Sequence, residues 1–402
     1  MCLCGKYVER LGHPSRPIYN KNNLLGEEID MASKSNILTG ITLFIIVLIG
    51  TQLLRLYRQP LGAPLELPSV TPMPVTLTSL PGGTEAAVTS APSPTATPQP
   101  LCGGPSVMNI LAIGSDARGS HYLYGLADII RLVRVDFVNA RVTVLEIPRD
   151  LWVDIPGISD HYGITQGKMN QAYLYGNKGL GYYNGPGEGP GLLARTLDLN
   201  LGVRPDHYLA VNMRTFENIV DAVGGIDVYL PYEVSLRSAE HPDWLHIEEG
   251  QHHFDGMTAL WVARIRQYNV FTRAENQNIV LCALRKKVLS PAIVPAIPEL
   301  IATFRRNVQT DLSPEQVNQL ACLATQMDGS SVVFASFPIE LFKNAKQFDP
   351  QLNDTTSVLE ADREILRDYI RRFQFGIWPD PNLVIHTTPS PGEADAAFSC
   401  ED

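Results

Sequence analysis

Apolar and polar residues alternate along several short stretches of the chain. This alternation predicts β-strands, because a strand turns successive side chains to opposite faces of a sheet. The predicted strands cover residues 109–114, 129–137, 141–147, 205–212, 226–231 and 330–338. In the third of them, Val144 should point to one face of the sheet, while Leu145 and Ile147 should point to the other.

Between these strands, apolar residues recur every three or four positions, which predicts helices. The predicted helices cover residues 189–202, 213–225, 255–266, 272–290, 313–327 and 360–374. The fifth begins with Ser313, Pro314 and Gln316, a capping-box sequence that marks a helix start. Because strands and helices alternate, we expect an α/β fold, a three-layer α-β-α sandwich in which helices cover both faces of one sheet.

A glycine-rich stretch, residues 176–191, invites comparison with a phosphate-binding loop. It lacks the Lys-Ser or Lys-Thr pair of a Walker motif, and it follows no convincing strand. We therefore expect a mobile loop at this place.

The N-terminal part of the chain has a different pattern. Residues 35–54 form an uncharged run of 20 residues, long enough to cross a hydrocarbon core of ~30 Å as a helix. We predict a transmembrane helix over residues 35–56. More basic residues precede it than follow it closely, so residues 1–34 should be cytoplasmic, and the rest of the chain should lie outside the cell membrane.

Two alternatives to a transmembrane helix are a buried helix of a soluble domain and a cleaved signal peptide. A buried helix rarely lacks charge over such a length. Against a signal peptide, the run starts late and no small-x-small cleavage site follows it. Met31, just before the run, is a second candidate for the true start of the chain.

Differences in amino-acid composition divide the rest of the chain into a linker, a domain and a tail. The segment after the predicted span contains eleven prolines and no lysine or arginine between residues 59 and 106, which is typical of extended, solvated chain. We therefore predict a linker over residues 57–106, a catalytic domain over residues 107–378 and a flexible tail over residues 379–402. Residues 107–402 hold 25 basic and 36 acidic residues, a net charge of −11, which disfavours nucleic-acid binding.

Four cysteines follow the predicted span: Cys102, Cys282, Cys322 and Cys400. A disulfide would persist outside the cell, but the pairing cannot be read from the sequence. Cys282 and Cys322 lie on predicted helices and are equally compatible with free buried thiols. None of the four has a metal-ligand spacing such as C-x-x-C.

Acids and arginines gather at the ends of the first predicted strands. Asp116 and Arg118 follow the first strand, Asp128 lies at the start of the second, and Arg149 and Asp150 follow the third. Ligands of α/β proteins usually bind at such strand ends. These residues are therefore candidates for one binding site.

Four further polar residues come later in the chain: Arg264, Arg266, Arg273 and Gln277. Arg264 and Arg266 do not share a face of an α-helix, so the helix must end near Arg266 if both reach one ligand. Arg273 and Gln277 are four residues apart and share a face.

Two carboxylates beside several guanidinium groups suit one kind of ligand. Mg²⁺ takes one or two carboxylates and shares the oxygens of a phosphate, and arginine binds phosphate through paired donors. The residues therefore predict a metal-bound pyrophosphate. The competing structural interpretation is that the aspartates form turns and the arginines form surface ion pairs. For Asp150 we expect that it orients Arg149 or caps the turn rather than acts in catalysis.

The order of these motifs resembles the LytR-CpsA-Psr family of bacterial cell-wall proteins. The resemblance covers residues 107–290 and rests on "NILAIGSDAR", "VTVLEIPRDLWVDIPG", "KMNQAYLYG", "HFDGMTALWVARIR" and "RAENQ". It implies a mixed central sheet with an apolar pocket for a polyprenyl tail. It also implies a Mg²⁺- or Mn²⁺-dependent phosphotransferase that moves a glycopolymer from a polyprenyl pyrophosphate carrier to a cell-wall acceptor such as peptidoglycan.

The resemblance also assigns roles to the candidate residues. Asp116 and Asp128 are expected near the metal, and they would form the catalytic group together with Arg149. The residues expected to bind the pyrophosphate are Arg118, Arg149, Arg264, Arg266, Arg273 and Gln277. Arg149 should reach the phosphates while apolar neighbours on its strand line the pocket.

Three positions depart from the family pattern. Leu126 stands where an arginine is usual, and either Arg118 or Arg131 is a candidate to compensate for it. Val270 stands where an acid is frequent, and Asn276 stands where an arginine often precedes the glutamine.

The missing acid leaves removal of the acceptor proton to the metal, Asp116 or Asp128. Two alternative functions therefore stay open. One is a pyrophosphatase that uses water as the acceptor. The other is a lipid-binding scaffold that keeps the pocket without turnover.

Overall fold

The computed structural model describes residues 44–67, 98–119, 121–236, 245–265, 270–380 and 398–400. The chain divides into two units, Met1–Arg58 and Gln59–Asp402. In the first unit, residues 44–58 form a helix whose apolar side chains are exposed. Within the described residues no helix is both long and apolar enough to cross a membrane, and residues 35–43 of the predicted transmembrane helix lie outside them.

A mixed β-sheet forms the centre of the second unit. In the described part of the chain its strands follow the order β11-β6-β1-β2-β3-β12-β15. Their bounds are β1 Val107–Ser115, β2 Ala127–Asp136, β3 Arg141–Glu146, β6 His207–Asn212, β11 Gln309–Thr310, β12 Val332–Ala335 and β15 Phe398–Ser399. Because β1 is antiparallel to β2 but parallel to β6, the prediction of a mixed central sheet is confirmed.

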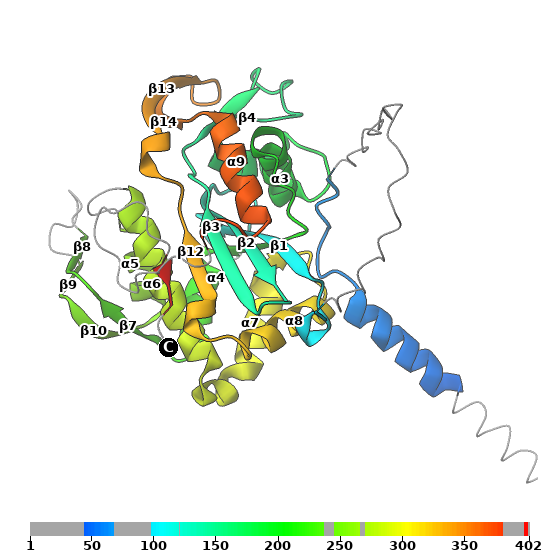
Figure 1. Ribbon diagram of the computed structural model, residues 1–402. Helices are drawn as coiled ribbons and strands as arrows, with labels where there is room; N and C mark the ends of the chain where they lie inside the picture. The colour runs from blue at the N-terminus through cyan, green and yellow to red at the C-terminus, as the bar shows by residue number, and fades with distance from the viewer. Residues whose placement is uncertain are drawn as a thin grey trace, which may run out of the picture. The chain divides into compact units, whose positions relative to one another are not determined.

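Helices cover both faces of this sheet (Figure 1). One layer contains α2 Met169–Gly176, α3 Glu188–Leu201 and α9 Arg363–Gln374. The other contains α4 Met213–Ala222, α5 Gly256–Val262, α6 Val270–Leu289, α7 Ile297–Asn307 and α8 Pro314–Ala324. Short 3₁₀ turns are η1 Leu101–Gly103, η2 Pro291–Ala296, η3 Gly329–Ser331 and η4 Ile339–Leu341. The predicted three-layer arrangement is therefore confirmed.

Further strands pair as hairpins outside the central sheet. These are β4 Trp152–Asp154 with β5 Gln166–Lys168, β7 Ile226–Leu230 with β10 Gly250–Phe254, β8 Val234–Leu236 with β9 Leu245–Ile247, and β13 Lys343–Asp349 with β14 Asp354–Glu360. The stretch 226–231 thus forms a strand, as predicted, but not a strand of the main sheet. Its buried residues join α4 and α6 in an apolar cluster of their own.

The side chains of β3 alternate between the two helical layers. Leu145, together with Ile147 just after the strand, belongs to the core shared with α2, α3 and α9. Val144 instead packs with Val332 and Phe334 on the opposite face. This is the division that the sequence pattern predicts.

The glycine-rich stretch 176–191 runs from the end of α2 into the first turn of α3, so only residues 177–187 form the loop that the sequence predicted over the whole stretch. A Cβ atom on Gly176 would lie 2.7 Å from the carbonyl oxygen of Glu188, and one on Gly191 would lie 2.0 Å from that of Pro186. The glycines are needed because the backbone segments approach each other closely here.

Two parts of the predicted linker contact the second unit. The backbone N–H of Leu61 donates to the carbonyl of Leu312 (3.1 Å), and the side chain of Leu65 is only 3% exposed within the main core. Cys102 forms a disulfide with Cys322 of α8. Residues well before Val107 therefore belong to the same compact unit as the sheet.

The C-terminal tail is also attached at its described end. Residues 398–399 form β15, antiparallel to β12, and Cys400 forms a disulfide with Cys282 of α6. The expectation of a flexible tail is wrong for these residues, because the disulfide pairing that ties them down cannot be deduced from spacing alone. Residues 381–397 lie outside the described part of the chain.

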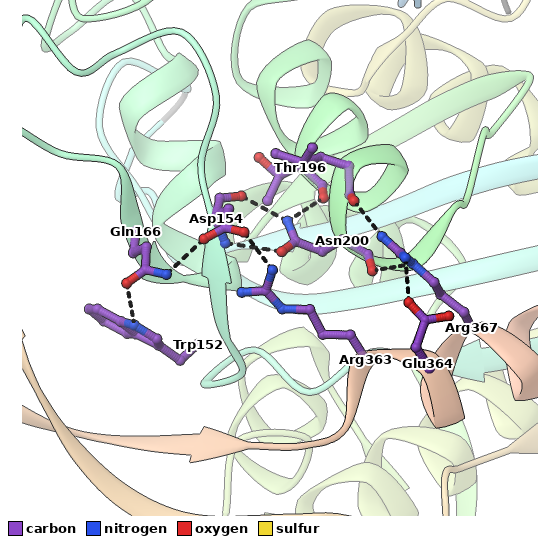
Figure 2. A network of polar contacts seen from close by, with 9 residues as sticks. Trp152, Asp154, Gln166, Thr196, Asn200, Arg363, Glu364 and Arg367 are labelled. Carbon is purple, nitrogen blue, oxygen red and sulfur yellow. Dashed lines mark hydrogen bonds and ion pairs between the residues drawn. The ribbon is translucent and has the colours of Figure 1, made fainter.

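A polar network fastens α9 to α3 and to the β4–β5 hairpin (Figure 2). The side chain of Asn200 accepts from the N–H of Asp154 (3.0 Å) and donates to its carbonyl (2.7 Å). Arg363 pairs with the carboxylate of Asp154 at 2.5 Å and lowers its pKa, and Arg367 donates to the carbonyl of Asn200. Because β4 follows Arg149 closely, this network holds the segment that leaves the candidate site.

Candidate active site

An apolar cavity of about 260 Å³ lies between the sheet and helices α4, α5 and α6. Its apolar lining includes Ala112, Ile129, Leu209, Val211, Phe216, Ile219, Leu260, Val280, Leu281 and Leu284. Its polar lining includes Ser115, Asp128, Arg131, Asn212, Arg264, Arg273 and Gln277. The cavity therefore combines an apolar interior with several ionic side chains. No residue of β3 lines it, so the expectation that apolar neighbours of Arg149 line the pocket is wrong.

The two candidate carboxylates lie at the ends of neighbouring strands. Asp116 follows β1, and its carboxylate accepts from the backbone N–H of Leu126 (2.6 Å). Asp128 is the second residue of β2 and borders the cavity. Burial raises the pKa of the Asp116 carboxyl, the charge of Asp128 adds to the rise, and the Leu126 N–H, Arg149 and Arg264 oppose it. The two aspartates are thus close enough to repel each other when both are charged.

Arg149 lies in the turn between β3 and β4 and forms an ion pair with Asp128. Its Nε also lies 3.3 Å from Oδ2 of Asp150, whose other oxygen is 3.5 Å from Nζ of Lys168. Asn170 N–H donates to the carbonyl of Arg149 at 3.1 Å, which fixes the turn. Asp150 orients Arg149, as predicted. Neither Arg149 nor Asp116 lines the cavity itself, so Asp128 joins them to it.

Arg273 reaches the same aspartate from α6. One terminal nitrogen donates to the carbonyl of Asp128 (2.7 Å), and the other lies 3.9 Å from its Oδ2. Two guanidinium groups from distant parts of the chain therefore converge on Asp128. The contacts between Arg273 and Asp128 hold α6 against β2 at the edge of the cavity.

Arg264 lies just after α5 and lines the cavity with an exposed side chain. The helix predicted to reach Arg266 ends at Val262, because the backbone N–H of Arg264 already turns back to the carbonyl of Trp261 (3.0 Å). Arg266 lies outside the described residues. The side chain of Val270 is not described either, although α6 begins there.

Both ends of the Gln277 amide have protein partners. Its Oε1 accepts from Arg131 (3.0 Å), and its Nε2 donates to the carbonyl of Ala263 (3.1 Å), the residue before Arg264. Gln277 therefore joins β2, α6 and the end of α5. It supports the segment that carries Arg264, which agrees with the expectation that Gln277 supports the phosphate-binding arginines.

Arg131 is a cavity residue that the sequence predicted only as a substitute for the arginine missing at Leu126. It is 4% exposed, donates to Oδ1 of Asn278 (2.7 Å) and lies over the ring of Phe334. Burial lowers its pKa, while the charge of Glu146, its partner across β2 and β3, raises it. Its guanidinium is thus fixed by hydrogen bonds to Asn278 and Gln277 in the protein that lines the cavity. The sequence alone did not single it out, because β2 also contains Asp128, Arg134 and Asp136.

Two of the predicted positions lie apart from this cluster. Arg118 is exposed and does not line the cavity. Asn276 is buried and accepts from the hydroxyl of Tyr232 (3.0 Å), so it faces another part of the domain. The residues that the structure brings together are Asp116, Asp128, Arg149, Arg264, Arg273 and Gln277.

Gln277→Ala is expected to lower the free energy of unfolding by about 1–3 kcal/mol, because the buried guanidinium of Arg131 loses a hydrogen-bond acceptor. Urea denaturation of the two proteins measures this difference. Gln319→Ala is the matched control, since it removes an exposed amide that donates to Gly103. Equal losses in the two variants would contradict a supporting role for Gln277.

Glu275 of α6 is a titratable group that is expected to affect the stability of the fold, although it does not line the cavity. Glu275 lies two residues from both Arg273 and Gln277, hence on another face of the helix, and does not line the cavity. Its Oε2 is buried without a hydrogen-bond partner among the described residues, and burial raises its pKa to about 7. The folded protein therefore keeps a proton that the unfolded chain loses near pH 4.5.

The contribution of Glu275 to stability is expected to fall as the pH rises from about 4.5 to about 7. The unfolded state binds fewer protons than the folded state throughout this range, which gives the slope its negative sign. Thermal unfolding from pH 4.5 to 8 should show a flatter profile for Glu275→Gln than for the wild type. Glu340→Gln, at an exposed position, controls for the change in net charge. Identical profiles for wild type and Glu275→Gln would show that Glu275 does not retain an extra proton in the folded state.

Comparison with known proteins adds independent information. The model of the LytR_cpsA_psr family matches residues 90–369. The regulatory protein MsrR of Staphylococcus aureus strain COL is 27% identical over 271 residues, which are 66% of this chain and 74% of MsrR. The polyisoprenyl-teichoic acid–peptidoglycan teichoic acid transferase TagU of Bacillus cereus strain AH820 is 28% identical over 229 residues, 55% of this chain and 67% of TagU. The crystal structure of B. subtilis TagV superposes with a TM-score of 0.51 at 23% identity, over 67% of this chain and 98% of TagV, and thus shares the fold.

Proposed function

The chain belongs to the LytR_cpsA_psr family, and from this premise we propose that it is a phosphotransferase that moves a glycopolymer from a polyprenyl pyrophosphate carrier onto a cell-wall acceptor such as peptidoglycan. The name of its relative TagU, a transferase between a polyisoprenyl-linked polymer and peptidoglycan, supports this proposal. The observation that carries it is one juxtaposition: an apolar cavity bordered by Asp128, on which Arg149 and Arg273 converge.

The two halves of such a carrier suit the two parts of the site. A polyprenyl chain is a hydrocarbon, and burial of its surface in the apolar cavity is favourable. The pyrophosphate is anionic and matches Arg149, Arg264 and Arg273 around the cavity edge. Arginine keeps its charge and donates in pairs to phosphate oxygens. A phosphate would compete with Asp128 for the guanidinium groups of Arg149 and Arg273.

Asp116 and Asp128 are the residues that would hold Mg²⁺ or Mn²⁺. Burial raises the pKa of Asp116 most, and the charge of Asp128 adds to the rise; a cation would neutralise this second contribution. Among the described residues no three His, Cys, Asp or Glu side chains gather as a metal site, so phosphate oxygens and water would complete the coordination. A bound divalent cation stabilises negative charge on phosphate oxygens.

The proposed reaction is attack of an acceptor hydroxyl on the sugar-linked phosphorus. A phosphorus–oxygen bond to the acceptor forms, the bond to polyprenyl phosphate breaks, and the arginines stabilise the negative charge on the oxygens. Asp116 and Asp128 are both candidates to accept the hydroxyl proton, since they are the carboxylates beside Arg149. Arg149 and Arg273 keep the phosphates in line.

Membrane anchoring is part of the proposal. The uncharged run at residues 35–54 would cross the cell membrane, with the N-terminus in the cytoplasm and the domain outside. Two disulfides, Cys102–Cys322 and Cys282–Cys400, support an oxidising location for the domain.

The test uses the full chain in vesicles with a polyprenyl-pyrophosphate sugar, peptidoglycan fragments and Mg²⁺. Release of polyprenyl phosphate and appearance of sugar on the fragments are measured separately. Metal-dependent transfer is the expected result. Release without any sugar transfer would indicate a pyrophosphatase, and tight carrier binding with no release would indicate a lipid-binding scaffold.

A further inference from the structure

The segment formed by η2 and α7 has apolar side chains on its outward face as well as on its inward face. Inward, Ala296 and Leu300 pack against the apolar cluster of α4, α6 and β7. Outward, Val294, Ile297 and Ile301 are 63%, 40% and 53% exposed. Ile297 and Ile301 are four residues apart and share one side of α7, and Val294 precedes them by one turn of the 3₁₀ helix η2. The outward face is thus an apolar stripe that the described residues leave uncovered.

The charge around this stripe differs from that of the domain. Residues 281–307 contain five basic residues and one acidic residue, whereas residues 107–402 together carry a net charge of −11. Arg305 of α7 is exposed and continues the stripe one turn beyond Ile301, and Lys286, near the end of the preceding helix α6, is exposed as well. A helix with apolar and basic side chains on one outward face is typical of contact with an anionic membrane surface.

The chain enters the domain close to the end of α7. Leu61 is hydrogen-bonded to Leu312, five residues after Asn307, the last residue of α7. A Cβ atom on Gly62 would lie 2.6 Å from the carbonyl oxygen of Thr310, which shows how closely the entering chain is applied to β11. Only Gln59 and Pro60 separate Leu61 from residue 58, so this stretch spans at most about 10 Å.

We propose that the docking face, defined as Val294, Ile297 and Ile301 with Lys286 and Arg305, lies on the surface of an anionic phospholipid bilayer. The proposal rests on the membrane anchoring proposed above and not on the transfer chemistry. The apolar side chains enter the interface, and the basic side chains contact the anionic head groups. This places the side of the domain that carries Leu61 and the end of α7 against the membrane.

Docking at this face has a structural link to the candidate site. α7 packs against α4, whose Phe216 and Ile219 line the cavity. The hydroxyl of Tyr122, in the loop that follows Asp116, donates to the carbonyl of Asn307 at the end of α7 (2.6 Å). The docking face therefore lies on the outer side of the helices that hold both the cavity wall and the site loop.

Tryptophan fluorescence of the full chain in vesicles tests the proposal. Ile301→Trp is expected to be quenched by brominated phospholipid in vesicles that contain phosphatidylglycerol, measured as the increase over the quenching of the native tryptophans. Ile365→Trp is the matched control, because Ile365 is an isoleucine on the outer side of α9 with 44% exposure. Leu48→Trp reports on the anchor independently.

The outcomes separate the two proposals. Quenching at position 48 without quenching at 301 would overturn the docking face and leave the anchor intact. Absence of quenching at both positions would overturn both. Equal quenching at 301 and 365 would show contact without a preferred face and would also overturn the docking proposal. Arg305→Gln should weaken the attraction to anionic lipid about fivefold, so quenching at 301 should fall in that background.

Discussion

Arg149→Ala is expected to reduce the rate of polyprenyl phosphate release by roughly 10²-fold or more, the typical cost of losing one electrostatic donor in a transition state. Arg149 is held by Asp128 and Asp150 at the edge of the cavity, where the pyrophosphate is proposed to bind. Because its guanidinium stabilises charge that develops during the reaction, the loss should appear mainly in kcat/KM. Steady-state assays of the full chain in vesicles, with release of polyprenyl phosphate from the carrier as the readout, measure this loss.

Arg371→Ala is the matched control for this substitution. Arg371 is an exposed arginine of α9 that pairs with Asp368 and has no contact with the cavity. Its removal should leave the release rate within about twofold of the wild type, as expected for a surface position. A similar, small effect of both substitutions would remove Arg149 from the proposed site. Thermal unfolding of both variants shows whether the fold is intact.

Asp128→Asn is expected to lower kcat by roughly 10²-fold and to raise the Mg²⁺ concentration needed for half-maximal rate. The substitution removes one of two carboxylates proposed for the cation. It also removes the counter-charge of Arg149 and Arg273, so the carrier's pyrophosphate should bind no more weakly than before. A lower kcat with unchanged or lower KM is therefore the distinguishing result.

Asp150→Asn controls for the loss of a carboxylate that touches Arg149 without bordering the cavity. It should change kcat by much less and leave the Mg²⁺ dependence unaltered. If Asp128→Asn instead raises KM and preserves kcat, Asp128 contributes to carrier binding alone. If the Mg²⁺ dependence also stays unchanged, the proposed cation site is wrong.

The grouping of the strand-end residues could be predicted from the sequence, because the underlying rule is local. Asp116, Asp128 and Arg149 each lie directly beside an alternating stretch, and the carboxyl and amino ends of neighbouring antiparallel strands meet at one edge of the sheet. Arg273 and Gln277 share a helix face by spacing alone. The assembly of these groups around one cavity therefore follows from order and periodicity.

The contacts of Arg131 and Gln277 could not be predicted in the same way. Whether Arg131 faces the cavity depends on strand register, in which it stands opposite Glu146. Whether Gln277 contacts a ligand or the protein depends on where α5 ends, since the carbonyl of Ala263 is its acceptor. Helix ends and register are set by tertiary packing, which a local pattern does not contain.

The pairing of the two disulfides could not be predicted from the sequence either. Four cysteines allow three pairings, and sequence separations of 220 and 118 residues give no preference among them. The disulfide of Cys400 brings β15 to the edge of the sheet, which the loose composition of the tail did not indicate. The extent of the glycine-rich loop could not be predicted for a related reason, because close packing of α2 on α3 requires glycine as much as a loop does.

The attachment of Leu65 and of Cys102 to the same domain changes the meaning of the proline-rich segment between them. A segment that begins and ends on one domain adds nothing to the reach of a tether. Under the proposed membrane anchoring, the tether consists only of Gln59 and Pro60, the residues between position 58 and Leu61, however many prolines follow. The domain is therefore expected to reach acceptors only in the layer of cell wall next to the membrane, and lengthening residues 68–97 should leave that range unchanged, whereas an insertion between residues 58 and 61 should extend it.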